Sequence, residues 1–348
     1  NKDFVGTATS VKVQIKDANG TKVETTYTPT VTDVTMESVD KTSEKPQGQT
    51  QTGKPEFTVS SPDVRITGYK LINPTTNTPV EDEEIEVPNQ GTYKIDKKTG
   101  QVTFVPKPGY TGTADGIKVQ ATDENGETKD AKYTPKVTPL TVTPGNKTSK
   151  NIQGVPQEET PTFTIPEGVT NASITERKLV DPTDSTPKDS VTVEGKGTFT
   201  IDGTGKVTFT PVPSYTGEVP AIEVQATVTV KNEKDETATI TSKATYKPEI
   251  VPVELGKTPA TSTNLQGLEQ KGTPTFTGKT VEVNGEQKEV TIKENSYTLV
   301  KDGAEVTTTP AYKKGTTDVI GTYTIDPATG EVTLTPTDKT YTGEVEPA

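Results

Sequence analysis

The 348-residue sequence contains no cysteine, no histidine and no tryptophan. Without cysteine the chain has no disulfide framework, no zinc–thiolate site and no thiol nucleophile. Without histidine it also lacks the most common general base. Carboxylates remain, but the sequence groups no two of them as a glycosidase pair. We therefore predict that the protein is not an enzyme, and we assign it no catalytic residue, no cofactor and no cofactor-binding or metal-binding residue.

Apolar residues are scarce. They make up 27% of the chain, and the 29 glycines raise that share only modestly, whereas a typical globular domain reaches about 45–50% with glycine included. The net charge of −12 is moderate for this length, so we expect folded domains with thin cores rather than a disordered chain. No apolar run approaches the ~20 residues that span a bilayer, and we expect no membrane contact.

Acidic residues outnumber basic ones, 49 to 37, and the two kinds are interspersed. Nucleic-acid binding needs lysine and arginine concentrated on one face, so we expect no nucleic-acid partner. An acidic surface keeps neighbouring molecules apart in solution. The absence of cysteine suits a secreted Gram-positive surface protein. Since neither a leader nor an anchor is recognisable, we expect the chain to be part of a longer one.

One segment recurs three times. It reads GTYKIDKKTGQVTFVPKPGYTG at 91–112, GTFTIDGTGKVTFTPVPSYTG at 197–217 and GTYTIDPATGEVTLTPTDKTYTG at 321–343. An aromatic residue marks its end, and such residues recur at intervals of about 105 residues, followed by one longer interval: Phe4, Tyr110, Tyr215 and Tyr341. This period is too long for solenoid repeats of about 20–50 residues and matches whole domains.

The repeat predicts four segments. Residues 1–34 are expected to be the C-terminal hairpin of a preceding repeat, 35–140 and 141–252 complete β-sandwich repeats, and 253–348 a repeat truncated before its last hairpin. Each of the last three opens with a Gln-Gly pair, at Gln47-Gly48, Gln153-Gly154 and Gln266-Gly267. The joints between them are rich in Thr and Pro, as in KVTPLTVTP, and proline makes such joints extended and semi-rigid.

The repeated segment has the pattern of a β-hairpin. Apolar residues alternate along both arms, with Tyr93 and Ile95 before the turn and Val102 and Phe104 after it. The turn begins with Asp and ends with a glycine such as Gly100, which can adopt a positive φ. We expect the apolar residues to form part of a core.

A second hairpin follows each aromatic residue. In the first copy Val11, Val13 and Ile15 share one face, and Asn19-Gly20 is the strongest short hairpin signal. In a later copy the hairpin is longer, since 31 positions separate Tyr215 from Tyr246 whereas 23 separate Tyr110 from Tyr133. An even-numbered insertion shared between two strands leaves the inward face unchanged.

The predicted fold class is all-β. No segment has sustained helical periodicity, and Thr, Val and Pro dominate between the turns. Roughly seven short strands per repeat indicate tandem antiparallel β-sandwich domains of immunoglobulin-like size. Short, stiff joints between such domains favour an elongated rod.

The motifs GTYTIDPATGEVTLTP…YTG and VQATDENG…Y-x-P resemble the fibril repeats of the CshA-type streptococcal surface adhesins. The resemblance covers nearly the whole chain and departs from the pattern where VQATVTVKNEKD replaces VQATDENG. In that family the repeats form a long fibril on the cell surface, and a separate N-terminal region binds the ligand. The resemblance therefore implies a spacer and supplies no binding residues.

The leading hypothesis is a structural stalk of a Gram-positive fibrillar adhesin. It projects a distal ligand-binding region from the cell wall, to which it is attached through a region outside this chain. Its expected contacts are the neighbouring repeats, while another region of the parent binds a host or bacterial surface ligand. The alternative is a set of weak-binding repeats that contact host glycoproteins directly and gain avidity from their number. The region from Phe57 to Gly91 differs most between copies, which favours the stalk.

A third hypothesis is self-association. The chain begins with the hairpin that its last repeat lacks, so the hairpin from Val11 to Tyr27 of one copy can complete the open sandwich of another by strand addition.

Two acidic stretches have competing interpretations. The loop of Asp123, Glu124 and Asn125 could hold calcium weakly, or it could be a turn that Asp and Asn cap. The second full repeat has no equivalent of this loop in its sequence. The acidic run from Glu81 to Glu86 could be a solvated loop, which we favour, or a ligand for a basic partner.

Two further interpretations concern side chains inside the repeats. Tyr93, Tyr110 and Tyr133 could stack on carbohydrate, but their recurrence at strand positions favours core packing. Lys and Asn are abundant enough for the intramolecular Lys–Asn cross-links of some surface domains, an alternative that the sequence leaves open.

Overall fold

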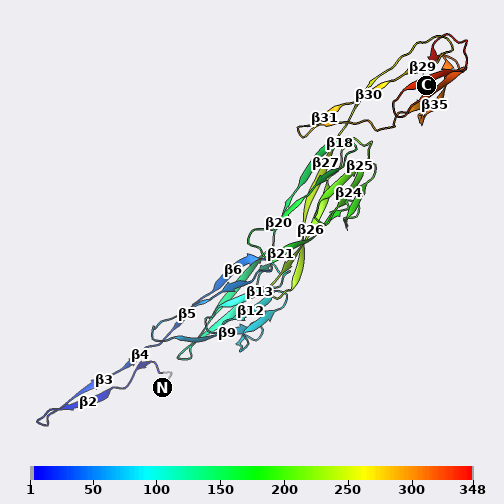
Figure 1. Ribbon diagram of the computed structural model, residues 1–348. Helices are drawn as coiled ribbons and strands as arrows, with labels where there is room; N and C mark the ends of the chain where they lie inside the picture. The colour runs from blue at the N-terminus through cyan, green and yellow to red at the C-terminus, as the bar shows by residue number, and fades with distance from the viewer. Residues whose placement is uncertain (1–3, 347–348) are drawn as a thin grey trace. The chain divides into compact units, whose positions relative to one another are not determined.

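The computed structural model describes residues 4–346 and is shown in Figure 1. Every regular element within that range is a β-strand, and no helix there is able to cross a membrane. The prediction of an all-β fold is confirmed. The outermost residues of the first and last predicted segments, 1–3 and 347–348, lie outside the described residues.

Three sandwiches follow one another along the chain. Sandwich A comprises β5 (Met36–Val39), β6 (Lys41–Pro46), β7 (Gln51–Gly53), β8 (Glu56–Val59), β9 (Ile66–Asn73), β10 (Thr78–Pro79), β11 (Glu84–Val87), β12 (Gly91–Ile95), β13 (Val102–Pro106), β14 (Gly112–Thr113), β15 (Ile117–Asp123) and β16 (Thr128–Thr138). One sheet has the order β10-β9-β15-β16-β14, with β6 also paired to β16, and the other has the order β11-β12-β13-β7.

Aromatic rings form the centre of sandwich A. The rings of Tyr93 and Phe104 lie 4.6 Å apart between centroids, and the ring of Tyr133 meets that of Tyr93 edge-on at 6.3 Å. All three side chains are fully buried. The prediction that Tyr93 and Tyr133 pack in the core is therefore confirmed, and neither ring is available to stack on a carbohydrate.

The hairpin of the repeated segment has the predicted geometry. β12 and β13 pair antiparallel with Tyr93 opposite Phe104, so the alternating apolar residues share the inward face. Asp96 Oδ1 accepts hydrogen bonds from the backbone N–H groups of Lys98 and Thr99. Gly100 closes the turn at a φ of 74°, a conformation that costs glycine little because it has no Cβ.

Sandwich B repeats this arrangement. Its strands are β17 (Thr143–Gly145), β18 (Lys147–Ile152), β19 (Gln157–Glu159), β20 (Thr162–Thr164), β21 (Ala172–Val180), β22 (Pro187–Lys188), β23 (Ser190–Val193), β24 (Gly197–Ile201), β25 (Val207–Pro211), β26 (Ile222–Lys231) and β27 (Thr237–Val251). The sheet orders are β18-β27-β26-β21-β22 and β19-β25-β24-β23. Phe199 and Phe209 lie 4.6 Å apart, and Tyr246 meets Phe199 edge-on at 6.1 Å, so the ring geometry of the core is preserved.

The pairing is not wholly antiparallel as predicted. In sandwich A, β6 runs parallel to β16, with Lys41 opposite Tyr133. In sandwich B, β18 runs parallel to β27, with Lys147 opposite Tyr246. The strand near the start of each sandwich thus lies beside the strand that ends it. Such a pairing is made by segments about 90 residues apart and leaves no local turn signal in the sequence.

A buried polar cluster joins these parallel strands to the core. The Ser43 hydroxyl lies 2.6 Å from both Gln51 Oε1 and the Tyr133 hydroxyl. The Gln51 amide in turn donates to the backbone carbonyl of Lys136 at 2.9 Å. We call this arrangement the Ser–Gln–Tyr cluster. It satisfies groups that would be costly to bury alone.

Sandwich B contains the same cluster. Ser149 lies 2.6 Å from Gln157 Oε1 and from the Tyr246 hydroxyl, and Gln157 donates to the carbonyl of Glu249 at 2.9 Å. Burial raises the pKa of Tyr246 to about 12, which keeps the phenol protonated and able to hydrogen-bond at every physiological pH.

In sandwich C the described residues form one five-stranded sheet and three two-stranded pairs, whereas sandwich B has sheets of five and four strands. The strands of sandwich C are β28 (Leu255–Thr258), β29 (Gln270–Gly272), β30 (Thr275–Gly278), β31 (Thr280–Val283), β32 (Glu286–Glu289), β33 (Leu299–Lys301), β34 (Ala304–Val306), β35 (Thr308–Lys313), β36 (Val319–Ile325), β37 (Val332–Pro336) and β38 (Val345–Glu346). The main sheet has the order β29-β37-β36-β35-β38, and the pairs β31-β32 and β33-β34 are separate hairpins.

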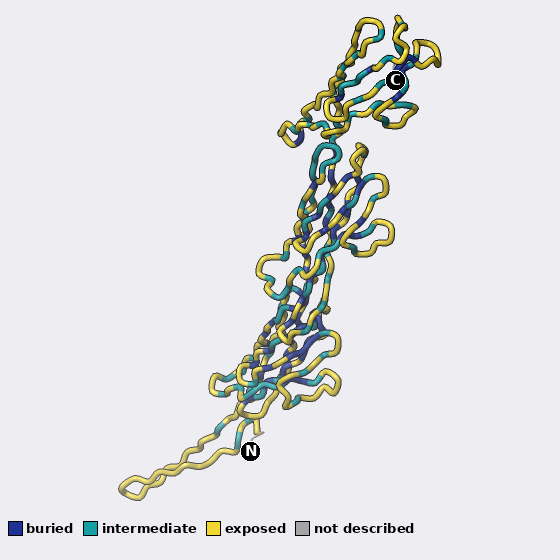
Figure 2. Tube along the Cα trace, turned by 45° about the vertical axis from the view of Figure 1, so that its right-hand side comes forward, coloured by how far each residue is buried: buried dark blue, intermediate teal, exposed yellow. Residues whose placement is uncertain are grey.

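The segment before sandwich A is a two-stranded ribbon. It contains β1 (Gly6–Thr7), β2 (Val11–Lys16), β3 (Lys22–Tyr27) and β4 (Thr30–Val31). We call β2 and β3 the N-terminal hairpin. Every one of its strand residues is exposed, as the yellow tube at residues 11–27 in Figure 2 shows, whereas dark blue marks the sandwich interiors.

Two compact units divide the chain. The first contains the residues up to Gly145 together with Thr162–Lys178 and Gln225–Ala244, and the second contains Asn146–Pro161, Leu179–Val224 and the residues from Thr245 onward. The far part of the β26–β27 hairpin therefore groups with sandwich A, although it belongs to sandwich B in the sequence.

Candidate functional site: a hairpin docked on the preceding sandwich

The hairpin of β26 and β27 is longer than its counterpart in sandwich A. β26 has 10 residues and β27 has 15, whereas β15 has 7 and β16 has 11. Four residues of strand extend a hairpin by about 13 Å. We call β26, β27 and their turn, Asn232–Glu236, the long hairpin. The predicted insertion lengthens both strands and leaves the alternation of inward residues intact.

The turn of the long hairpin has the same construction as the other two hairpins, which corrects the expectation that sandwich B has no equivalent. Asn232 Oδ1 accepts hydrogen bonds from the backbone N–H groups of Lys234 at 3.0 Å and Glu236 at 3.1 Å. In sandwich A, Asp123 Oδ1 accepts from the two corresponding N–H groups at 2.9 Å each. An amide oxygen can replace a carboxylate oxygen in this capping role. A comparison of residue identities therefore does not detect that the two turns are equivalent.

The loop considered for calcium is therefore occupied with capping its own turn. Asp123 is 3% exposed, and one of its oxygens accepts both backbone hydrogen bonds. Among the described residues no group of three or more acidic side chains is placed to hold a metal ion. The structure thus has the capped turn at Asp123, and the absence of a metal-binding residue stays a prediction.

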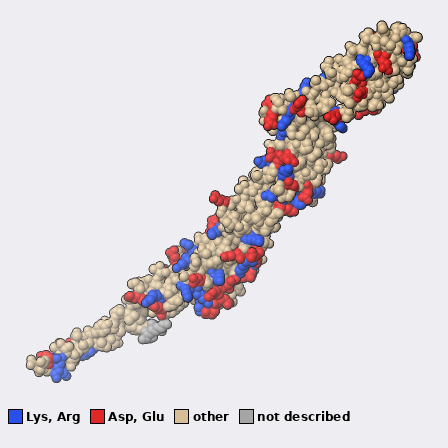
Figure 3. Space-filling model, viewed as in Figure 1, with Lys and Arg blue, Asp and Glu red and all other residues tan. Residues whose placement is uncertain are grey.

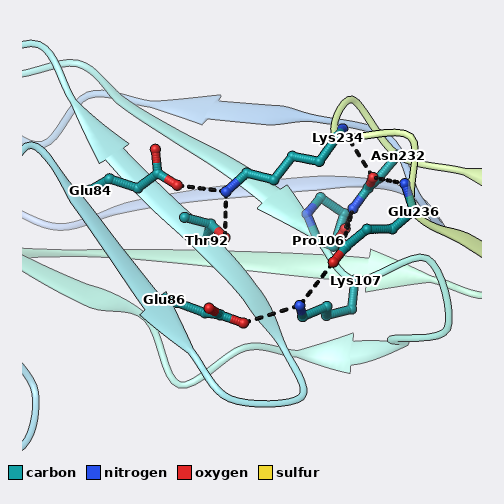
Figure 4. A network of polar contacts seen from close by, with 8 residues as sticks. All are labelled: Glu84, Glu86, Thr92, Pro106, Lys107, Asn232, Lys234 and Glu236. Atoms are coloured by element: carbon teal, nitrogen blue, oxygen red, sulfur yellow. Dashed lines mark hydrogen bonds and ion pairs between the residues drawn. The ribbon is translucent and has the colours of Figure 1, made fainter.

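The tip of the long hairpin contacts sandwich A directly, as Figure 4 shows. The Asn232 side-chain amide donates to the carbonyl of Pro106 at 3.0 Å and to Glu236 Oε2 at 2.7 Å. Lys234 donates to Glu84 Oε1 at 2.5 Å and to the Thr92 hydroxyl at 3.2 Å. Asn232 is 7% exposed, so this contact excludes water from its amide.

Lys107 of sandwich A lies between carboxylates from both sides of the contact. Its ammonium is 3.0 Å from Glu86 Oε1 and 3.1 Å from Glu236 Oε1. Hydrogen bonds that Lys107 donates to these two carboxylates raise the pKa of Lys107. The Asn232 amide and, next, Lys107 lower the pKa of Glu236. The tip therefore keeps its charges at neutral pH and loses a partner only when acid protonates Glu236.

The acidic run is exposed, as the interpretation favoured from the sequence expects, and three of its glutamates also pair with lysines of the same chain. Glu81 pairs with Lys70 at 2.5 Å and Glu86 with Lys107, both within sandwich A. Glu84 pairs with Lys234 of the long hairpin. The run and its partner lie about 150 residues apart in the chain, so no local pattern could connect them.

The long hairpin also contacts sandwich A at Gly48, the glycine of the first repeated Gln-Gly pair. The Asn171 amide donates to the carbonyls of Gln47 at 3.2 Å and Lys231 at 2.8 Å. A Cβ on Gly48 would lie 2.6 Å from that amide and 2.7 Å from Val230. Gly48 thus permits close approach of the long hairpin, in addition to taking a φ of 74°.

The joint between the sandwiches is part of the packed structure. Leu140 and Val142, from the Thr/Pro-rich segment, are each 7% exposed. The Ser242 hydroxyl on β27 donates to the carbonyl of Val142 at 3.2 Å. Burial of two apolar side chains and a bond to the long hairpin restrict the joint more than proline alone would.

A second length insertion also lies beside a preceding sandwich. The hairpin of β31 and β32 falls in the lengthened part of sandwich C, and Asn284 at its turn lines a polar cleft of about 870 Å³ together with residues of β18. The backbone N–H of Val253 approaches Gln153 Oε1 at 3.5 Å in the same unit. Both insertions therefore lie where one sandwich follows another.

These contacts join the tip of the long hairpin to sandwich A, within one compact unit. The paired groups are lysines, carboxylates and amides, and the reciprocal charges satisfy one another. Over the face seen in Figure 3, basic and acidic side chains lie next to each other, in agreement with the interspersed charges of the sequence. The arrangement favours mechanical coupling between neighbouring domains.

Replacing Asn232 with alanine tests the contact. We expect a loss of about 1–3 kcal/mol in the free energy that closes the tip, because the Pro106 carbonyl and two turn N–H groups lose their partner. Hydrogen–deuterium exchange of the residues from Lys231 to Glu236 should accelerate accordingly. The matched control is Asp123→Ala in the shorter hairpin, which removes the equivalent cap and should not change exchange at the long hairpin. Unchanged protection in Asn232→Ala would show that the amide contributes nothing.

Comparison with known proteins gives one family. The family described as the surface adhesin CshA repetitive domain matches residues 1–31, 33–137, 139–250 and 252–348. No curated protein matches the sequence.

Solved structures also match the chain, with low sequence identity and low TM-scores. The I9–I11 tandem of titin matches with a TM-score of 0.28 and 10% identity, covering 86% of this chain and 88% of that one. The human CDH23 EC21-23 structure matches with a TM-score of 0.25 and 14% identity, covering 84% and 87%. The human desmocollin-1 ectodomain matches with a TM-score of 0.27 and 12% identity, covering 92% and 59%.

Proposed function

The chain belongs to the family of surface adhesin CshA repetitive domains, and we propose that it serves as a stalk segment of a Gram-positive fibrillar adhesin. In this role the repeats hold a distal ligand-binding region away from the cell wall, to which another part of the parent protein is attached. The protein is extracellular, has no enzymatic activity and acts mechanically. Its partners are the neighbouring repeats.

The observation that carries the proposal is the docked long hairpin. A joint that only connects two domains lets them swing freely, whereas here bending would break the contacts of Asn232, Lys234 and Lys107 together. Exposed ion pairs contribute only about 0.2–1 kcal/mol each. A network with a buried amide at its centre opposes bending more strongly than separate pairs, because its members share partners.

The repeat units follow the predicted boundaries in this proposal, at 35–140, 141–252 and 253–348. Each adds about 40 Å, from strands that rise about 3.3 Å per residue together with turns and a joint. Three units in line, together with the segment that precedes them, therefore extend about 130 Å. The interspersed charges of the surface keep neighbouring fibrils from adhering to one another.

The surfaces that differ between repeats argue against direct binding by each repeat. In sandwich B, Lys188 pairs with Asp181 at 2.6 Å and with Asp184 at 3.0 Å, and these contacts help to lower the pKa of Asp181 to about 2. The equivalent turn in sandwich A has Asn73, whose side chain caps backbone N–H groups. An array that gains avidity needs the same ligand-binding groups in every copy. The charged groups of this turn in sandwich B have no counterpart in sandwich A.

Small-angle X-ray scattering tests the stalk. We expect a radius of gyration of about 37 Å, the value for a rod of about 130 Å built from units of the stated strand rise. A compact globule of this length gives about 20 Å and an unfolded chain about 67 Å. Data extrapolated to zero concentration describe the single chain.

A triple variant makes the test specific for the long hairpin. Asn232→Ala, Lys234→Ala and Glu236→Ala together remove the tip contacts, and we expect the radius of gyration to fall as the joint bends. The matched control alters the same turn positions of sandwich A, as Asp123→Ala, Asn125→Ala and Glu127→Ala. A wild-type value near 20 Å refutes the spacer role, and an unchanged triple variant refutes the part assigned to the long hairpin.

A further inference from the structure

One carboxylate at the tip of the long hairpin contacts both an amine and a carboxamide (Figure 4). Glu236 Oε1 accepts a hydrogen bond from the Lys107 ammonium at 3.1 Å, and Glu236 Oε2 accepts one from the Asn232 side-chain amide at 2.7 Å. All three residues lie in the same compact unit. Transfer of a carboxamide carbon from ammonia to a lysine needs these groups: a nucleophile, a carbonyl carbon and a proton carrier.

The carboxamide of Asn232 is held in a way that favours attack at its carbon. Its Oδ1 accepts hydrogen bonds from the backbone N–H groups of Lys234 at 3.0 Å and Glu236 at 3.1 Å. Two N–H donors on one oxygen stabilise the negative charge that develops there when a nucleophile adds to the carbonyl carbon. Asn232 is 7% exposed, so little water competes for these donors. The amide nitrogen, which donates to Glu236 and to the carbonyl of Pro106, is the group that would leave.

The amine of Lys107 is shared between two carboxylates. It lies 3.0 Å from Glu86 Oε1 and 3.1 Å from Glu236 Oε1, and its side chain is 35% exposed. A lysine side chain is long and flexible, so the amine can leave Glu86 and move along the Glu236 carboxylate towards the carbon of Asn232. The hydrogen bonds to the two glutamates raise the pKa of Lys107, and only the neutral amine is a nucleophile. A reaction here is therefore slow at neutral pH and accelerates as the pH rises.

The equivalent turn of sandwich A lacks these groups. Asp123 caps it through one oxygen, and its other oxygen, Oδ2, is buried and meets no hydrogen-bond partner among residues 4–346. The N-terminal hairpin is capped by another carboxylate, that of Asp17. A carboxylate has no ammonia to lose, and its negative charge disfavours the addition of a nucleophile. Of these three turns, the one with a carboxamide cap is also the one whose cap meets the Glu236–Lys107 pair.

We propose that Lys107 and Asn232 form an intramolecular isopeptide bond after folding. Glu236 takes a proton from the Lys107 ammonium, and the neutral Nζ adds to Cγ of Asn232. The Nζ–Cγ bond forms, the Cγ–Nδ2 bond breaks, and Glu236 returns its proton to the departing nitrogen. One ammonium side chain and one carboxamide become one secondary amide and one ammonium ion, so the reaction consumes no oxidant, reductant or cofactor. The bond fixes the tip of the long hairpin to sandwich A, whether or not the chain serves as a stalk.

Intact-mass spectrometry of the full chain tests the proposal. Samples are incubated at neutral pH and at about pH 10, near the ordinary pKa of lysine. We expect the mass to fall by one molecule of ammonia, faster at the higher pH, and digestion to release a branched peptide that joins Lys107 to Asn232. Lys107→Arg keeps a cation between the two glutamates but cannot form the bond, and should retain the full mass. The matched control, Lys234→Arg, changes the neighbouring lysine of the same network and should form the bond as the wild type does.

A further variant tests the carboxylate. Glu236→Gln keeps a hydrogen-bonding side chain at the tip but cannot carry the proton, and we expect the bond to form about 10²–10⁴ times more slowly. Circular dichroism confirms that each variant is folded. A folded wild type that retains its full mass at both pH values overturns the proposal. Loss of ammonia that persists in Lys107→Arg, as a succinimide at an Asn-Gly pair would produce, also overturns it, and an unchanged rate in Glu236→Gln refutes the role of that carboxylate.

Discussion

Replacing Tyr133 with alanine is expected to unfold sandwich A at temperatures where the wild type is folded. The ring is fully buried, meets Tyr93 edge-on and bonds through its hydroxyl to Ser43. Removal of a buried aromatic side chain costs about 3–5 kcal/mol, and whole domains are stable by only about 5–15 kcal/mol. For a domain of this size the melting temperature should fall by more than about 10 °C. Differential scanning calorimetry measures the shift.

Two further variants separate the contribution of the Tyr133 hydroxyl from the contribution of its buried ring. Tyr133→Phe removes only the hydroxyl and should cost about 1 kcal/mol, the usual net value of one hydrogen bond. Tyr27→Ala changes the corresponding tyrosine of the N-terminal hairpin, which is 61% exposed, and should change stability by less than about 0.5 kcal/mol in dilute, monomeric protein. Equal losses for Tyr27→Ala and Tyr133→Ala would contradict the burial that distinguishes the two sites.

Replacing Gly197 with alanine is expected to destabilise sandwich B by about 1–3 kcal/mol, because it overfills a packed hairpin. The new Cβ would lie 2.5 Å from the carbonyl oxygen of Thr210 and 2.7 Å from the ring of Phe209. Neither atom can withdraw without moving the backbone or the core. Urea unfolding followed by far-ultraviolet circular dichroism measures the change.

The control for Gly197 lies six residues along the same hairpin. A Cβ on Gly203 meets no atom within 4 Å, and its φ is not positive. Gly203→Ala should therefore be neutral or stabilise the sandwich by about 0.4–1 kcal/mol through the entropy of the unfolded chain. If Gly197→Ala and Gly203→Ala change the free energy of unfolding equally, the backbone preference of alanine, and not the close contact at Gly197, governs stability here.

Local patterns in the sequence were sufficient for much of the fold. The alternation around Tyr93 and Phe104 and the Asp-to-Gly turn at Gly100 specify a hairpin and its inward face through interactions within a few residues. The recurrence of this hairpin also indicated tandem domains and their family. These features depend on short-range backbone and side-chain preferences. The sequence of each copy is therefore sufficient to specify its own hairpin.

The prediction from the sequence was wrong at a position where the residue type differs between repeats but its structural role is the same. Asn232 does the capping work of Asp123, and the loss of the DENG letters suggested that the loop was absent. The acidic run from Glu81 to Glu86 is exposed, as expected, but its lysine partners could not be recognised from composition. Lys234 lies about 150 residues away and reaches Glu84 only because the hairpin is longer.

The all-β class, the repeat, the hairpins and the insertion that lengthens one of them can all be predicted from the sequence. The contacts of the insertion, the parallel strand pairs and the meeting of serine, glutamine and tyrosine in the core become visible in the folded protein alone. The reason is the range of the interactions. Turns and alternating faces are set by neighbours in the chain, whereas the contact of Lys234 with Glu84 and the cluster of Ser43, Gln51 and Tyr133 form only after distant segments have packed together.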